Sequence, residues 1–295
     1  MKNNKKSMTS VYNKKKHPFD VFLYVSIYLA SIITVLILIG IISYVLINGV
    51  PYITIEFLTT QYSENNENLK GILPMIINTV YIVVITLLIA TPIGISSAIY
   101  LTQYAKQGKL VKAIRFTTEV LSGIPSIIFG LFGYTIFCTM FRLGTSIIAG
   151  CLTMTLCILP IIIRTTEESL MSVPKAYSEG ALALGAGKLR TILGIVLPCA
   201  MPGVLTAVIL AMGRIVGESA ALLYTSGMAY NMPKDFIGQI FSSGRTLTLH
   251  LYQISKQANT ENAFHIAFAT ASVLLILIFI LNLIANFISR KIRKG

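Results

Sequence analysis

The chain has 295 residues, of which 55% are hydrophobic and only 12% are charged, and its net charge at pH 7 is +13. Soluble globular domains carry about a quarter charged residues, so this composition excludes an ordinary soluble domain and indicates an integral membrane protein. Basic and aromatic residues are not interleaved on any polar segment. The positive charge therefore does not indicate a nucleic-acid partner.

The amino-terminal part is a basic tail, predicted over 1–19, followed by a long apolar run. Val21 to Ile47 holds no charged residue, whereas the hydrophobic core of a signal peptide spans only about 7–15 residues before a small-residue cleavage site. Because this run is much longer, we predict an uncleaved first membrane span.

Six segments are long and apolar enough to cross a bilayer, which requires about 20 residues per helix. Pro92 and Pro160 lack a backbone N–H, so the second and fourth helices are expected to kink or stop there. We predict an all-α integral membrane protein with six transmembrane helices, a membrane domain over 20–290, a cytoplasmic tail over 291–295, and spans at about 20–47, 73–101, 116–140, 144–163, 200–224 and 264–288.

Basic residues are distributed unevenly among the segments that connect these spans. Of the 24 Lys and Arg residues, 18 lie on the side of the two termini, five lie on the opposite side, and Arg214 lies within a predicted span. Segments rich in Lys and Arg stay in the cytoplasm, so both termini are predicted to be cytoplasmic. The two longer outer loops, at about 48–72 and 225–263, have room for short helices or a docking surface.

The largest inner loop, 164–199, is predicted to fold as two helices joined by a glycine turn. Ser172 and Pro174 are typical of a helix start, and Gly185 can adopt the left-handed conformation that ends this helix. A second, amphipathic helix is expected to follow until Pro198. From composition alone, an amphipathic segment lying on the membrane fits this loop equally well.

The stretch "SEGALALGAGKLRTILGIVLP" in this loop resembles the EAA motif of ABC importer permeases. The residues that carry the resemblance are Glu179, Gly180, Ala181, Gly185, Ile195, Leu197 and Pro198. Gly180 stands where the motif usually has alanine. The resemblance implies that this loop is the coupling helix, which docks into a groove on a separate ATP-hydrolysing subunit.

The sequence "GAGK" at 185–188 does not make the chain an ATPase. A phosphate-binding P-loop follows the pattern GxxxxGK[ST], whereas this chain has Leu182 in place of the first glycine and Leu189 in place of the Ser or Thr. We therefore expect a transport subunit that is not an enzyme and has no catalytic residue, metal or cofactor. ATP would be bound by the partner subunit.

Beyond this loop, the chain resembles the PstA-type permeases of phosphate ABC importers over roughly residues 20 to 290. The stretches that carry the resemblance are "TPIGISSAIYL", "EVLSGIPSIIFGLFGY", the EAA loop and "GRIVGESAALL". It implies a type I importer permease (MetI-like) fold in the bacterial cell membrane, with this chain forming half of the pathway for inorganic phosphate. The implied partners are a second permease of PstC type, two copies of a PstB-like ATP-binding subunit, an extracytoplasmic PstS-like phosphate-binding protein and membrane lipid.

Arg214 and Glu218 are the only charged residues between Thr191 and Lys234. Each charge costs about 2.5–3.5 kcal/mol at the centre of a membrane helix, so we expect both to lie on the transport pathway. Positions four apart face the same side of a helix, which predicts an ion pair directed at the pore, and an arginine fork suits phosphate oxygens. The alternative is a structural pair that locks two spans together.

The remaining buried or interfacial polar groups are assigned simpler roles. Glu119 is expected to be an interfacial charge or the partner of a nearby Lys or Arg. The four cysteines, Cys138, Cys151, Cys157 and Cys199, form no CxxC pair and have no histidine at metal-ligand spacing, so they are expected to act as small buried hydrophobes.

Two other functions compete with phosphate import. The same type of importer could carry another oxyanion, such as molybdate or sulfate. A secondary transporter would instead require proton-relay carboxylates and inverted repeats. Apart from Glu218, the predicted spans hold no central carboxylate, and the sequence has no evident internal repeat.

Overall fold

The computed structural model describes residues 18–62, 70–230, 232, 235–256 and 261–292. The regular secondary structure of these residues is helical, apart from one isolated antiparallel bridge between Tyr62 and Lys70, and turns and irregular segments connect the helices. Residues 1–17 of the predicted basic tail, 63–69 of the first outer loop and 293–295 of the carboxyl-terminal tail lie outside the described residues.

The helices follow one another along the chain without a strand between them in the described ranges. The α-helices are α1 (Pro18–Gly49), α2 (Ile55–Thr59), α3 (Leu73–Ile99), α4 (Lys109–Ser122), α5 (Ser126–Gly133), α6 (Ile147–Ser172), α7 (Lys175–Ala183), α8 (Lys188–Thr191), α9 (Leu197–Gly217), α10 (Ala220–Thr225), α11 (Phe236–Ile240), α12 (Leu247–Lys256) and α13 (Glu261–Ile292). A 3-10 helix, η1 (Val50–Tyr52), and three π-helical segments, η2 (Tyr100–Tyr104), η3 (Tyr134–Met140) and η4 (Ile192–Val196), complete the order.

The chain divides into two units, residues 1–47 and residues 48–295. In the first unit, α1 is composed almost entirely of apolar residues, and its side chains are largely exposed. A bilayer supplies the apolar surroundings that such a helix requires. In length and composition, α1 is therefore a membrane-spanning helix.

In the second unit, α3, α6 and α9 pack against one another and form the main hydrophobic core. The side chains of Met154, Ile158 and Ile162, on α6, are completely buried in it. A Cβ placed at Gly94 of α3 would lie only 2.5 Å from Cγ2 of Ile162. Small residues of this kind allow membrane helices to approach closely, because lipid provides no hydrophobic force for their association.

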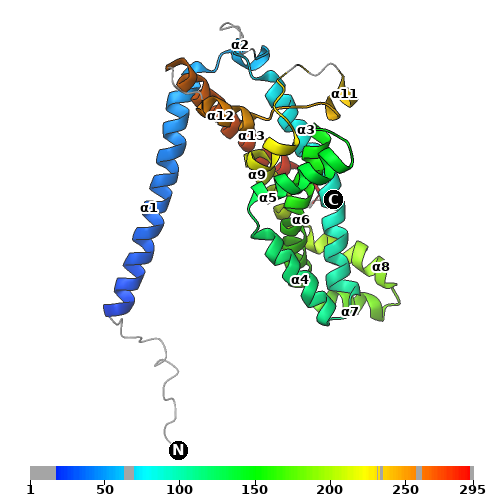
Figure 1. The fold of residues 1–295 in the computed structure, drawn as a ribbon. Coiled ribbons are helices and arrows are strands. Elements are labelled where there is room, and N and C mark those ends of the chain that lie inside the picture. The colour runs from blue at the N-terminus through cyan, green and yellow to red at the C-terminus, as the bar shows by residue number, and fades with distance from the viewer. Residues whose placement is uncertain (1–17, 63–69, 231, 233–234, 257–260, 293–295) are drawn as a thin grey trace, which may run out of the picture. The chain divides into compact units, whose positions relative to one another are not determined.

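The two ends of this bundle carry the predicted inner and outer loops. Figure 1 shows α7 and α8, from the inner loop, at one end of α3, and α2 and α11, from the outer loops, at the other end. The elements predicted to face the ATPase and those predicted to face outward are thus separated by the length of the bundle.

Five helices of the described residues are long and apolar enough to cross a membrane, and a bent pair raises the number to six. This pair corrects the predicted third span, 116–140, because α4 and the α5–η3 segment are bent by 100° at the break between them. Pro125 lacks an N–H and disfavours the helical conformation of the residue before it. The helix consequently ends at Ser122 and a new one begins at Ser126.

The prolines inside the second and fourth spans do not end their helices. α3 continues past Pro92, and α6 continues past Pro160 as far as Ser172, well beyond the predicted end at 163. Membrane helices tolerate proline because neighbouring helices and local adjustments satisfy the backbone groups that it leaves free.

Candidate functional site

Arg214 lies in the last turn of α9, and its half-buried side chain reaches α6. Its Nη2 donates a hydrogen bond to the Sγ of Cys157 at 3.7 Å. Its Nε is buried and has no hydrogen-bond partner among the described residues. Within the described part of the chain, no carboxylate oxygen lies within 4.0 Å of the guanidinium. The guanidinium therefore has donors available for another group.

Glu218 does not share a helix with Arg214, so the ion pair expected from their spacing is wrong. α9 ends at Gly217, and Glu218 adopts an extended conformation with φ −79° and ψ 127°, which interrupts the predicted span 200–224. Glu218 is 8% exposed, and its Oε1 accepts the backbone N–H of Ala221 at 3.2 Å. Glycine weakens the helix, and the first N–H groups of the next helix need acceptors. Glu218 supplies one of them.

The short helix after this break, α10, is held closely by α5. A Cβ placed at Gly130 of α5 would lie 2.9 Å from the Cα of Ala221. The backbone N–H of Ser146 also donates to the carbonyl of Thr225 at the end of α10. Contacts from two sides therefore hold the segment that carries Glu218.

The inner loop has the helix–glycine–helix form predicted from its sequence. α7 is followed by Gly185 with φ +84°, which confirms the left-handed conformation expected at this position. Glu179 and Gly180 are exposed, Ala181 is buried, and Leu184 is 91% exposed. Tyr177, Leu182 and Leu189 of the same loop are exposed as well, and a group of exposed apolar side chains is typical of a contact surface.

The sequence predicted that the second helix of this loop ends at Pro198, and this prediction is wrong. α8, η4 and α9 form one helical run from Lys188 to Gly217. The π-helical turn η4 directly precedes Leu197 and Pro198. The backbone hydrogen bonds therefore change from the α-helical to the π-helical spacing just before the position where proline removes a donor. Ile195 and Leu197 are half-buried, whereas Pro198 is exposed.

The inner loop also contacts the end of α3. Nζ of Lys188 lies 4.7 Å from the centre of the Tyr104 ring, in a cation–π contact. A pocket of about 410 Å³ lies nearby and is lined by residues from η2, α6, α7 and η4, including Gln103, Ser178 and Glu179. The loop that carries the EAA motif is thus connected to two spans of the bundle.

Ion pairs join α4 to the last turns of α6. Arg115 Nε lies 3.2 Å from Oε1 of Glu167, and Arg164 Nη1 lies 3.6 Å from Oε1 of Glu119. Arg164 also contacts Glu168 through Nε at 3.1 Å. The expectation that Glu119 pairs with a nearby basic residue is confirmed, and this residue is Arg164.

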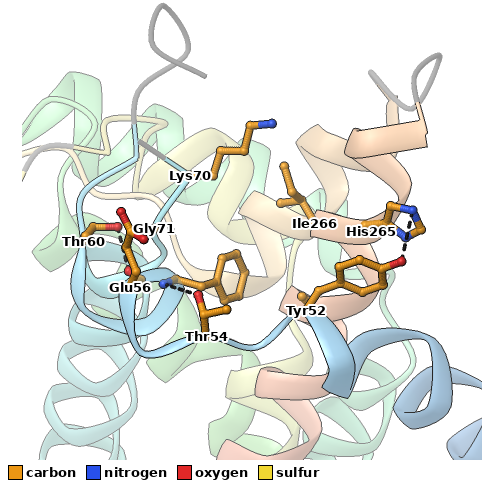
Figure 2. Close-up of a pocket in the computed structure, with 10 residues that line it drawn as sticks. Tyr52, Thr54, Glu56, Thr60, Lys70, Gly71, His265 and Ile266 are labelled. Atoms are coloured by element: carbon orange, nitrogen blue, oxygen red, sulfur yellow. Dashed lines mark hydrogen bonds between the residues drawn. The ribbon is translucent and has the colours of Figure 1, made fainter. Parts of the chain in front are cut away.

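A pocket of about 400 Å³ opens at the other end of the second unit (Figure 2). Tyr52 and His265 stack with ring centres 4.0 Å apart, and the Tyr52 hydroxyl lies 3.3 Å from Nε2 of His265. Glu56 and Lys70 contribute groups of opposite charge to its lining. Such a mixed polar pocket is suited to contact with polar protein side chains and has no single charge preference.

Sequence reasoning missed a buried polar cluster near this end. Arg245 is 4% exposed and lies over the rings of Tyr62 and Tyr230, and His250 is completely buried with its ring edge-on to Tyr62. Neither ring nitrogen of His250 has a hydrogen-bond partner among the described residues. Burial, and secondarily the charge of Arg245, lowers the pKa of His250 to about 3, so this histidine is neutral at physiological pH.

The cysteines fulfil the expected role only in part. Cys138, Cys151 and Cys157 are buried, but Cys199 is exposed, and Cys157 also accepts a hydrogen bond from Arg214. No sequence signal predicts this contact, because the two residues lie 57 positions apart on different helices. In the described residues, no group of three or more His, Cys, Asp or Glu side chains could hold a metal ion.

Comparison with known sequences yields one family and several relatives. The family described as "Binding-protein-dependent transport system inner membrane component" matches residues 90–294. The probable ABC transporter permease protein YqgI of Bacillus subtilis (strain 168) is 36% identical over 275 residues, which cover 90% of this chain and 93% of YqgI. The phosphate transport system permease protein PstA of Pasteurella multocida (strain Pm70) is 31% identical over 238 residues, which cover 81% of this chain and 82% of that protein.

Comparison with solved structures agrees with the all-α importer fold. A chain of a bacterial alginate ABC transporter, in complex with an alginate pentasaccharide-bound periplasmic protein, matches with a TM-score of 0.67 and 18% identity. The match covers 94% of this chain and 96% of that chain. A chain of the inward-facing MetNI methionine ABC transporter matches with a TM-score of 0.58 and 20% identity, over 76% of this chain and 94% of that chain. The chain therefore has the type I importer permease (MetI-like) fold.

Proposed function

Because the chain belongs to the family of binding-protein-dependent transport system inner membrane components and is a permease subunit of an ABC importer, we propose that its cargo is inorganic phosphate. One observation carries this proposal. Arg214 places a guanidinium at the end of a membrane span, with no carboxylate within 4.0 Å of it among the described residues and with a buried Nε that has no partner there.

The chemistry of this group suits an oxyanion. A guanidinium keeps its charge in any protein environment and presents planar donors that match two phosphate oxygens at once. If Glu218 neutralised this charge, the attraction for an anion would be weaker. The carboxylate instead accepts from the start of α10, which leaves Arg214 available. In this proposal Arg214 contacts the anion, and Glu218 shapes the pathway by ending α9.

The inner loop is the proposed contact with the ATPase. The residues assigned to coupling are Glu179, Gly180, Ala181, Gly185, Ile195, Leu197 and Pro198. The exposed Leu184 at the turn supports an interface, and the helical run from Lys188 to Gly217 connects the loop to the turn that holds Arg214. Movement of the docked loop would thereby reach the pathway, and ATP would be bound and hydrolysed by the partner alone.

The complete transporter in this proposal contains two different permeases, two ATP-binding subunits and an extracytoplasmic phosphate-binding protein. Several relatives are named phosphate transport system permease protein PstA, which supports partners of PstC, PstB and PstS type. Both termini lie in the cytoplasm of a bacterial cell, as the basic-residue asymmetry predicts. The polar outer pocket at Tyr52 and His265 then faces the binding protein.

Transport by the assembled complex in lipid vesicles tests the cargo. Uptake of labelled phosphate, driven by ATP in the presence of the binding protein, is expected to fall when unlabelled phosphate is added and to persist when sulfate or molybdate is added. Arg214→Gln is expected to abolish this uptake while the complex still assembles. Uptake of molybdate or sulfate in place of phosphate would reassign the cargo to that oxyanion.

A further inference from the structure

Cys157 occupies a special position relative to the proposed anion contact. Within the described residues, the guanidinium of Arg214 makes one hydrogen bond, from Nη2 to the Sγ of Cys157 at 3.7 Å. Cys157 lies in the interior of α6 and is 4% exposed. The thiol therefore contacts the guanidinium from inside the bundle.

The chemistry of a thiol differs from that of the usual partners of arginine. Sulfur is a weak acceptor, and a neutral thiol does not cancel the charge of the guanidinium. A carboxylate in its place would bind two N–H groups and compete with an incoming anion. A single sulfur contact can restrict the side chain while the remaining N–H groups stay available.

Restricting the side chain has a measurable consequence for binding. Arginine is among the side chains that lose most rotamer freedom when they are ordered. A guanidinium that is already oriented before the anion arrives avoids part of this loss at the binding step. Removal of the contact that restricts the Arg214 side chain is expected to lower the apparent affinity for the anion more than it lowers the maximal rate.

We propose that Cys157 is a positioning residue for transport: its sulfur accepts one N–H of Arg214 and orients the remaining N–H groups toward the anion. This inference rests on the proposed function, in which Arg214 contacts phosphate. Cys157 itself is not assigned a contact with the anion.

Three substitutions separate the acceptor from the packing role of this side chain. Cys157→Ser keeps an acceptor, Cys157→Val removes the acceptor but fills the site with a slightly larger apolar side chain, and Cys157→Ala removes both the acceptor and most of the volume. In vesicles containing the complete transporter, the Val and Ala variants are expected to raise the KM for phosphate roughly threefold to tenfold. The Ser variant is expected to stay within about twofold of the wild type, and the maximal rate per assembled complex should change little in all three.

A purely packing role predicts a different pattern. Cys157→Val would then resemble the wild type, whereas the Ser and Ala variants would yield less assembled complex without a change in KM, and that result would overturn the proposal. Cys151→Val is the matched control, because Cys151 is fully buried on the same helix and its Sγ lies 4.0 Å from the carbonyl of Ile82, with no contact to Arg214. Its KM should equal that of the wild type.

A double-mutant cycle adds a readout specific to the contact. Lysine at position 214 lacks the Nη2 donor, so Cys157→Ala should have no further effect on KM in the Arg214→Lys background. An equal rise in KM caused by Cys157→Ala in the wild type and in the Arg214→Lys variant would contradict the positioning role. If Arg214→Gln transports normally, the proposed pathway role fails; if only Arg214→Gln is impaired and both Cys157→Val and Cys157→Ala keep the wild-type KM, the positioning role alone fails.

Discussion

Arg214 and Glu218 lie four residues apart on opposite sides of a helix break, and they do not form an ion pair. The guanidinium contacts the thiol of Cys157 on α6, while the carboxylate accepts the N–H of Ala221 at the start of α10. The two residues therefore have different roles. The guanidinium has donors available, whereas the carboxylate already accepts a backbone hydrogen bond, so substitutions should separate the two roles.

Glu218→Gln is expected to retain more transport than Glu218→Ala. The amide oxygen of glutamine can still accept the N–H of Ala221, whereas alanine leaves this buried donor without a partner at a cost of about 1–3 kcal/mol. Phosphate uptake per assembled complex, measured for both variants in vesicles, checks the expectation. If Glu218→Gln is as inactive as Glu218→Ala, the negative charge itself is required and the capping role is insufficient.

Exchange of the two charges, Arg214→Glu/Glu218→Arg, is expected to abolish phosphate uptake. The exchange places a carboxylate where the anion would meet the guanidinium, and arginine at 218 has no acceptor for the N–H of Ala221. ATP hydrolysis and copurification of the partner subunits serve as controls for assembly. Near-normal uptake by this variant would assign the positive charge on the pathway to another residue.

Gly185→Val is expected to weaken the association with the ATPase. The residue has φ +84°, a conformation that costs a β-branched residue about 1–3 kcal/mol, so the turn after α7 should rearrange. Gly187→Ala is the matched control, since Gly187 has φ −68° and a Cβ there would have no atom within 4 Å. Copurification of the ATPase should fall for the first variant only, and equal recovery would argue against docking by this loop.

Gly130→Val is expected to destabilise the membrane domain by about 1–3 kcal/mol. A Cβ at this position would lie 2.9 Å from the Cα of Ala221, so α5 and α10 would have to separate. Gly213→Ala is the control, because a Cβ at Gly213 would meet no atom within 4 Å. Thermal unfolding of the purified protein should show a lower Tm for Gly130→Val alone.

His250 is expected to make the protein less stable as the pH falls below about 6.5. Its folded pKa is lowered to about 3, so between these two values the unfolded chain binds a proton that the folded chain does not. The contribution of His250 to the free energy of unfolding is complete above about pH 6.5, and the free energy of unfolding is lower by about 2 kcal/mol at pH 5. Tm measured from pH 7 to pH 5 should fall more steeply for the wild type than for His250→Gln; parallel curves would show that the imidazole titrates normally.

Single cysteines test the orientation of the membrane domain. The starting variant lacks all native thiols, because it carries Cys157→Ser and alanine replaces the other three cysteines. In this variant, Gln61→Cys should react with an impermeant thiol reagent added outside intact cells. Lys106→Cys, at the other end of α3, should react only after the membrane is permeabilised. Both residues are exposed in the structure. The reverse labelling pattern would place the termini outside and remove the basis for docking of the ATPase.

The sequence alone determined the features that depend on local composition. A run of apolar residues long enough to cross a bilayer forms a helix, because lipid offers the backbone N–H and C=O groups no hydrogen-bond partner. Gly185 was predicted to adopt a left-handed conformation because glycine has no Cβ to oppose it, and φ +84° confirms this. The spacing of the EAA residues likewise predicts a permease of an ABC importer, and the family match over residues 90–294 confirms it.

Tertiary structure decided the features that depend on residues far apart in the chain. The break at Gly217 is stable because Glu218 caps α10 and because α5 packs against α10 through Gly130, and no periodicity in "GRIVGESAALL" reveals that packing. The partner of Arg214 was decided by the approach of α6 to α9, which brings together residues 57 positions apart. Local propensity sets where a helix can form, whereas the packed neighbours determine where it ends and which side chain its charge meets.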